Sequence, residues 1–184
     1  CLEEGRLAAS LESYGRTLEL AHRLGDRSQE AVVLVNLGGL YLVLGDHERA
    51  REHIQASRTL CLELGTRRVL GYALLGMGDL QRERGDPAAA AKHYEACLAL
   101  RREISYAHGV AEALLALGRL HRSTGSTAAA VDCLEGARSV SQEVGVEEVR
   151  VRALCDLALL GAVDVGEARA AFEAAQDRLM QRDR

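Results

Sequence analysis

An internal repeat of 40 residues is the feature that most restricts what this chain can fold into. Three series of residues keep this spacing: a large apolar residue followed by glycine, a second glycine, and an alanine. They are Leu37-Gly38, Met77-Gly78 and Leu117-Gly118; Gly45, Gly85 and Gly125; and Ala50, Ala90 and Ala130. A repeat of this length is one supersecondary unit that buries its apolar face against its neighbours, so the period predicts a stacked array.

Each unit has the pattern of two antiparallel helices. Apolar residues recur at helical spacing, as in Leu34, Leu37, Tyr41 and Leu44. Glycines such as Gly45 and Gly65 suit the left-handed residue just past a helix end, and Ser105 replaces glycine at one such turn. Pro87 stands at a first helical position, where its missing N–H costs nothing. Side chains that can cap the following helix come directly after the turn glycines, at Asp46, Asp86 and Ser126.

Composition supports an all-α fold and excludes several classes of partner. Aromatic residues make up 3% of the 184 residues and there is one proline, which argues against a β-sandwich or barrel. The formal net charge of −4 gives no basis for a nucleic-acid partner. No apolar run reaches the length that a membrane-spanning helix needs. The cysteine count of five is odd and no pair has CxxC spacing, so we expect reduced thiols and a cytoplasmic location.

No catalytic or metal-binding pattern is found in the sequence. HExxH, P-loop, GxGxxG and GxSxG motifs are all missing. His53 and His93 occupy equivalent repeat positions beside the packing residues Ile54 and Tyr94, and we interpret them as half-buried packing residues. The sequence therefore predicts a protein that is not an enzyme and holds no cofactor or metal.

The repeat resembles the tetratricopeptide repeat family. Its pattern of apolar residue, Leu-Gly, Tyr-like residue, Gly, Ala, large apolar residue and Ala is followed closely in three units. They read Leu34, Leu37-Gly38, Tyr41, Gly45, Ala50, Ile54, Ser57; Leu74, Met77-Gly78, Gln81, Gly85, Ala90, Tyr94, Cys97; and Leu114, Leu117-Gly118, His121, Gly125, Ala130, Leu134, Ala137. The resemblance implies a right-handed α-solenoid, a superhelix of antiparallel helix pairs, with about nine helices.

We expect one array that covers residues 1–184. Residues 1–25 are a partial repeat with its second helix alone, at residues 6–24. Full repeats follow at 26–65, 66–105 and 106–145, and an irregular capping repeat with a turn shortened by two residues occupies 146–184. The period of 40 is longer than the common one of about 34 residues. The longer form looks like Pins-type adaptors and like the repeat regions of bacterial multidomain regulators, so we expect a fragment of a larger protein.

The resemblance also implies a concave groove lined by the first helices of successive units. Its positions in this sequence predict a peptide-binding surface made of Val32, Val35, Asn36, Leu42, Val43, Tyr72, Leu75, Asp79, Arg82, Leu115, Arg119 and Arg122. The valines and leucines form a more apolar floor than a solvated surface needs. Arginine forks suit carboxylates. We therefore expect a protein or peptide partner with apolar anchors and acidic residues.

Alternative interpretations of the groove stay open at this point. A neighbouring segment of the full protein could cover the apolar floor, and the arginines could pair with Asp79, Glu83 and Glu112. The asparagine ladder of Pins-type adaptors is represented by Asn36 alone. The leading hypothesis is a signalling or regulatory interaction scaffold. Its rivals are an intramolecular sensor domain of a bacterial transcription regulator, cyclase or kinase, and self-association through the uncapped N-terminal helix.

Overall fold

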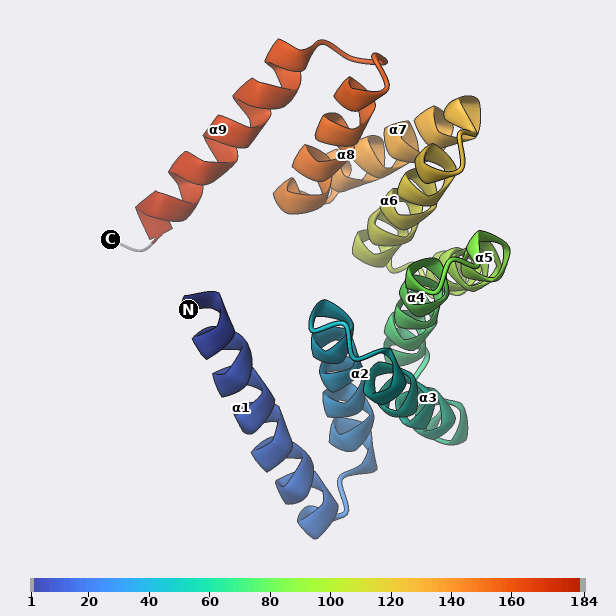
Figure 1. The fold of residues 1–184 in the computed structure, drawn as a ribbon, viewed down its shortest axis with the longest axis vertical. Helices are drawn as coiled ribbons and strands as arrows, with labels where there is room; N and C mark the ends of the chain where they lie inside the picture. Colours follow the sequence, from blue (N-terminus) through green and yellow to red (C-terminus); the bar gives the residue numbers. More distant parts are fainter. Residues whose placement is uncertain (1, 183–184) are drawn as a thin grey trace. The chain divides into compact units, whose positions relative to one another are not determined.

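The computed structural model describes the backbone of residues 2–182 and the side chains of residues 6–178. Within that range all regular structure is helical, in nine helices, which confirms the expected all-α class (Figure 1). They are α1 (Leu2–Leu24), α2 (Arg27–Val43), α3 (His47–Leu64), α4 (Arg67–Glu83), α5 (Pro87–Glu103), α6 (Ala107–Ser123), α7 (Thr127–Glu143), α8 (Glu147–Leu159) and α9 (Val165–Arg182).

The chain divides into two compact units, residues 1–100 and 101–184, and the division falls within α5. In the first unit α2 packs against α3, α3 against α4, and α2 directly against α4, while α1 packs on α2. In the second unit α6, α7 and α8 repeat the same arrangement and α9 packs on α8. Each unit therefore brings the first helices of two successive repeats into contact.

Helices α2 to α8 begin 20 residues apart, as a 40-residue repeat of two helices requires. The carboxylates of Asp46 and Asp86 accept hydrogen bonds from the backbone N–H groups of Arg49 and Ala89, which confirms both predicted caps. Ser126 occupies the expected position before α7, but its side chain makes no capping hydrogen bond, so that part of the prediction is wrong.

Helix pairs approach closely where a glycine of the first helix faces a large side chain of the second. A Cβ atom added at Gly38 would lie within 3.0 Å of Ile54, and one at Gly78 would lie as close to Tyr94. Gly118 has the same relation to Leu134. Ile54, Tyr94 and Leu134 are all buried. The missing Cβ is therefore what allows the large residue to fill the space between the helices.

Buried hydrogen bonds and the ion pair of a buried arginine also contribute to the packing. Ser57 Oγ donates to the carbonyl of Ala31 at 2.7 Å, and at the equivalent position Cys97 Sγ contacts the carbonyl of Gly71 at 3.1 Å. Arg101 is 0% exposed. Its Nη1 donates to the carbonyl of Gly109 at 2.6 Å and lies 3.0 Å from Glu112 Oε2. Such a charge stays in a core because it is paired and hydrogen-bonded.

The two ends of the array differ from the sequence-based expectation. Helix α1 begins at Leu2, four residues before the expected start at position 6. At the other end it is α8 that is short, at 13 residues against 17 in α6, while residues 160–164 form a longer connection. Helix α9 consequently starts at Val165, two residues early in the 40-residue register.

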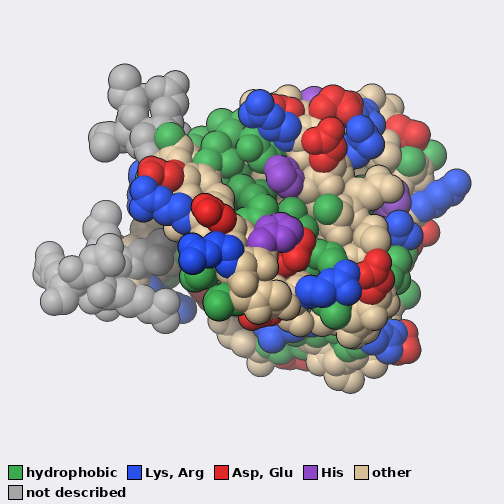
Figure 2. Space-filling view, turned by 90° about the horizontal axis from the view of Figure 1, so that it is seen from below, with side chains coloured by type: hydrophobic (Ala, Val, Ile, Leu, Met, Phe, Trp, Pro, Cys, Tyr) green, Lys and Arg blue, Asp and Glu red, His purple; other side chains and the backbone are tan. Residues whose placement is uncertain are grey.

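The exposed surface carries charges of both signs side by side. Figure 2 shows Lys and Arg side chains lying beside Asp and Glu side chains over the face it presents. Ion pairs one helical turn apart, such as Arg51 with Glu48 and Arg150 with Glu147, join charges of opposite sign within single helices. Among the described residues, no helix combines the length and the apolar character needed to cross a membrane.

Two neighbouring glycines of α2 provide a test of the close approach. Gly38→Ala forces Ile54 to move, and we expect it to lower the free energy of unfolding by about 1–3 kcal/mol. Gly39→Ala adds the same methyl group where nothing lies within 4 Å. Because alanine favours the helix over glycine, we expect it to raise the free energy of unfolding by about 0.5–1 kcal/mol. Urea denaturation followed by circular dichroism measures both, and equal effects of the two substitutions would contradict the packing argument.

Ser105 is a second test, because it has a positive φ of 54° where the equivalent turns have glycine. The left-handed conformation costs a residue with a side chain about 1–2 kcal/mol, and glycine removes this cost. Glycine also gives the unfolded chain more conformational freedom, which offsets part of the gain in stability. We expect Ser105→Gly to raise the free energy of unfolding by up to about 1 kcal/mol. Ser105→Val should lower it, and thermal denaturation of both variants distinguishes the signs.

Candidate functional site

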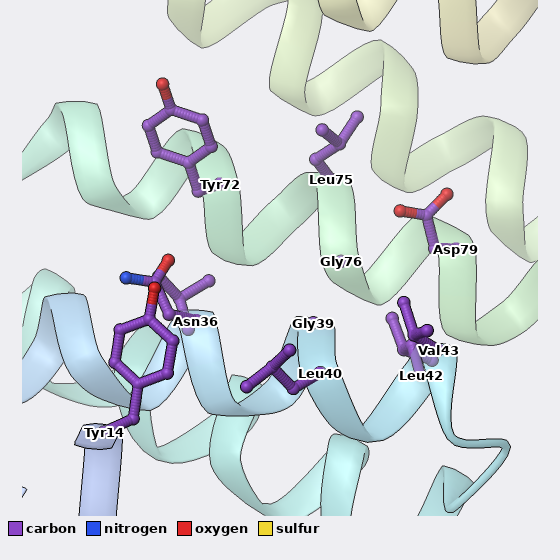
Figure 3. A pocket seen from close by; sticks show the side chains of 11 residues that line it. Tyr14, Asn36, Gly39, Leu40, Leu42, Val43, Tyr72, Leu75, Gly76 and Asp79 are labelled. Atoms are coloured by element: carbon purple, nitrogen blue, oxygen red, sulfur yellow. The ribbon is translucent and has the colours of Figure 1, made fainter. Parts of the chain in front are cut away.

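A cavity of about 320 Å³ lies in the first unit, between α1, α2 and α4. Figure 3 shows Tyr14 and Asn36 at one end of it and Val43 and Asp79 at the other. Most of its wall is aliphatic or glycine, and no basic side chain belongs to it. The residues that line it are Tyr14, Val35, Asn36, Gly39, Leu40, Leu42, Val43, Tyr72, Leu75, Gly76 and Asp79. A cavity of this size and character can take an aliphatic side chain.

At the end of the cavity that contains Asp79, a buried tyrosine holds the carboxylate in place. The Tyr94 hydroxyl donates a hydrogen bond to Asp79 Oδ1 at 2.6 Å. Burial, followed by the charge of Asp79, raises the pKa of the Tyr94 phenol, so this group remains a donor at neutral pH. Arg82 lies beside them and pairs with Glu83 at 2.7 Å. Asp79 is therefore held in place from inside the helix pair.

Seven of the twelve predicted groove residues line this cavity. They are Val35, Asn36, Leu42, Val43, Tyr72, Leu75 and Asp79. Val32 is half-buried and Arg82 is exposed, and neither belongs to the wall. Leu115, Arg119 and Arg122 lie in the second unit. Leu115 was expected to contact the partner, but it is 6% exposed and belongs to the core of α6.

In the second unit two predicted arginines meet a carboxylate of the same unit. Arg119 Nε lies 2.6 Å from Asp156 Oδ2, and Arg122 Nη2 lies 3.1 Å from Asp156 Oδ1. Glu112 was the acidic partner considered from the sequence, but it pairs instead with Arg101 and lies 3.5 Å from His108. For Arg82, the expected alternative of pairing with Glu83 is present.

Four wall residues are not among the twelve predicted ones: Gly39 and Gly76, which stand at groove positions of the repeat, and Tyr14 and Leu40, which do not. Tyr14 stands 40 residues before Ile54, so the repeat register held a signal for it as a packing position. Its half-buried ring faces the cavity instead of a glycine of its own repeat. Leu40 carried no such signal, because neither spacing nor residue type distinguishes it from its helical neighbours.

Comparison with known proteins decides the family. A family model described as Tetratricopeptide repeat matches residues 1–63, 29–103 and 69–143. This chain belongs to the tetratricopeptide repeat family. Tetratricopeptide repeats generally mediate protein–protein interactions and are typically non-enzymatic scaffolds.

A similar fold is also found among solved structures. BtubC (BKLC) from P. vanneervenii matches with a TM-score of 0.71 and 20% sequence identity, over 91% of this chain and 71% of that one. This likeness shows the fold, an all-α solenoid. No curated protein matches the chain.

The repeated histidines of this tetratricopeptide chain take part in packing. His53 stacks on Tyr41 with ring centroids 5.3 Å apart. Burial lowers the pKa of His53, with Glu52 opposing and Arg49 adding to the shift. Burial, followed by Arg58, lowers the pKa of His93. Within the described part of the chain, no three His, Cys, Asp or Glu side chains gather closely enough to hold a metal ion.

These two histidines predict a pH dependence of stability. Their pKa values in the folded chain are below the ordinary value of 6.5, so the unfolded chain binds protons first as the pH falls. The stability that these two neutral imidazoles contribute is fully present above about pH 6.5, and it is lost as the pH falls through their pKa values in the folded chain. We expect the free energy of unfolding to decrease as the pH falls below about 6.5.

The control for this prediction is the double variant His53→Gln/His93→Gln. Glutamine does not titrate, so the decrease in unfolding free energy over the same pH range should be smaller than in the parent. Urea denaturation at several pH values measures both slopes. Identical slopes in parent and variant would assign the pH dependence to other groups.

Proposed function

We propose that this tetratricopeptide chain is a non-enzymatic interaction scaffold that binds a peptide segment of a partner protein on the first helices of its repeats. The apolar cavity between α1, α2 and α4 is the single observation that supports this most. It takes an aliphatic anchor of the peptide, and Asn36 and Asp79 at its two ends bind polar groups of the peptide backbone.

The magnitudes assign different tasks to the two kinds of contact. Burying one aliphatic side chain contributes about 1.5–3 kcal/mol. An exposed ion pair contributes about 0–1 kcal/mol. The cavity of the first unit therefore supplies affinity, and the exposed arginines, Arg82 in the first unit and Arg119 and Arg122 in the second, select acidic residues of the partner.

The cellular setting is part of the same proposal. Four cysteines among the described residues are free thiols, and two of them, Cys61 and Cys97, are buried in the core. Buried free thiols suit a reducing compartment, which supports a cytoplasmic location. A signalling or regulatory role within a larger protein agrees with a module that recognises a segment of another chain.

The cavity is tested by filling it from an open glycine. Gly39 lies in the cavity wall, and a Cβ atom there meets nothing within 4 Å, so Gly39→Leu places a leucine side chain where the anchor would bind. Gly15→Leu is the matched control, because Gly15 is also an open helical glycine and is not part of the wall. Both substitutions should leave the helical circular dichroism unchanged.

The probe is a fluorescein-labelled peptide with blocked ends in which leucine and glutamate alternate, and fluorescence anisotropy measures its affinity. We expect Gly39→Leu to weaken binding by about tenfold or more, since the anchor loses its cavity. Gly15→Leu should keep the affinity of the parent within about twofold. Equal binding by all three proteins would reject the cavity as the peptide site.

A further inference from the structure

Asp156 of the second unit is a buried carboxylate that meets two arginines. Its side chain is 5% exposed, whereas those of Arg119 and Arg122 are 42% and 38% exposed. Each carboxylate oxygen contacts one guanidinium, at 2.6 and 3.1 Å. The inner side of this cluster is therefore covered, and its outer side, made of the two guanidinium groups, faces solvent.

The cluster has donors and charge left over after this internal pairing. A guanidinium has five N–H donors, and Asp156 takes up few of them. Two positive charges meet one negative charge, so the cluster carries a net charge of about +1. Among the described residues, Arg119 and Arg122 both pair with Asp156 and with no other carboxylate. The unused N–H groups can donate hydrogen bonds to a second carboxylate from outside.

Asp156 also gives the arginines a defined position. A free arginine side chain loses much rotational freedom when it binds a ligand. Here the buried carboxylate bridges from α8 to both arginines of α6, so part of that freedom is already lost in the folded chain. A ligand then meets guanidinium groups that are ordered before it arrives, which favours binding.

An exposed aliphatic residue stands one helical turn after Asp156. Leu159 follows Asp156 by three residues on α8, so the two occupy the same side of the helix. Leu159 is 72% exposed. A segment with a carboxylate beside an aliphatic residue therefore matches both features. A polyanion does not match, because the cluster carries one net positive charge in a chain whose formal net charge is −4.

We propose that Arg119 and Arg122, positioned by Asp156, form a binding site for a glutamate or aspartate side chain of a partner peptide, with Leu159 contacting the aliphatic residue beside it. This deepens the proposed function and rests on it, because it names the chemistry that the second unit recognises. Asp156 acts as a positioning residue and does not touch the ligand.

The test compares two peptides on the whole chain. One is the labelled alternating leucine–glutamate peptide, and the other has glutamine in place of every glutamate. We expect the parent to bind the glutamate peptide about tenfold more tightly than the glutamine peptide, and R119Q/R122Q to lose most of this preference, while the intact Arg82 keeps a small part of it. An unchanged ratio of affinities in R119Q/R122Q would overturn the proposal, and so would failure of the parent to bind the glutamate peptide.

Two further variants separate recognition from net charge and from folding. R102Q/R169Q removes two exposed arginines elsewhere in the second unit, and it should keep the parent's ratio of affinities. Loss of the ratio in this control would assign the preference to overall charge and overturn the site. R119Q/R122Q/D156N removes the unpaired buried carboxylate, so it keeps the test valid if the double variant unfolds.

Asp156→Asn examines the positioning role. Removing the negative charge leaves the cluster more positive, so charge alone would raise the preference for the glutamate peptide. Positioning predicts the opposite, a fall of the ratio by about threefold or more at unchanged helical content. A rise would overturn the role given to Asp156. If Gly39→Leu weakens binding while R119Q/R122Q keeps the ratio, the proposed function stands and this inference fails.

Discussion

The structure depends on one steric relation, the contact of a large side chain on a second helix with a glycine on the first. Ile54 lies against Gly38 and also near Gly76, where an added Cβ would be 3.0 Å from its Cδ1 atom. One side chain thus packs between two successive first helices. Because the helices approach this closely, α2 contacts α4 directly and α6 contacts α8. The cavity of the first unit and the ion cluster of the second both lie on such a pair of first helices.

The same geometry supports two different chemistries because the repeat does not fix the residues on that side. At one register position the chain has Asn36, Gly76, Ala116 and Asp156. The first two line an apolar cavity. The last is a buried carboxylate, which is tolerated because two guanidinium groups from α6 meet it. The repeat therefore fixes the backbone, and single side chains determine what each unit can bind.

This division also explains how far the sequence could be read. The 40-residue period contains the helix boundaries, since capping, turn and packing residues recur with it, and seven of the predicted groove residues do line a cavity. Pairings across helices could not be read in the same way. Arg119 and Asp156 are 37 residues apart and belong to no repeated series, so their contact depends on side-chain rotamers. The buried Arg101 could not be predicted either. The equivalent positions in the other repeats are the small residues Cys61 and Ser141, so the repeat gives no sign of a buried arginine.

A buried carboxylate is costly, and its surroundings indicate why it is tolerated at Asp156. Moving a charge from water into a protein costs several kcal/mol, and well-packed apolar residues often give equal or greater stability. Stability alone would thus favour a leucine at this position, where the neighbouring Leu157 is fully buried. A leucine would leave Arg119 and Arg122 as two mobile side chains on α6. The carboxylate instead holds both guanidinium groups towards α8 with their outer donors exposed, an arrangement that serves recognition more than folding.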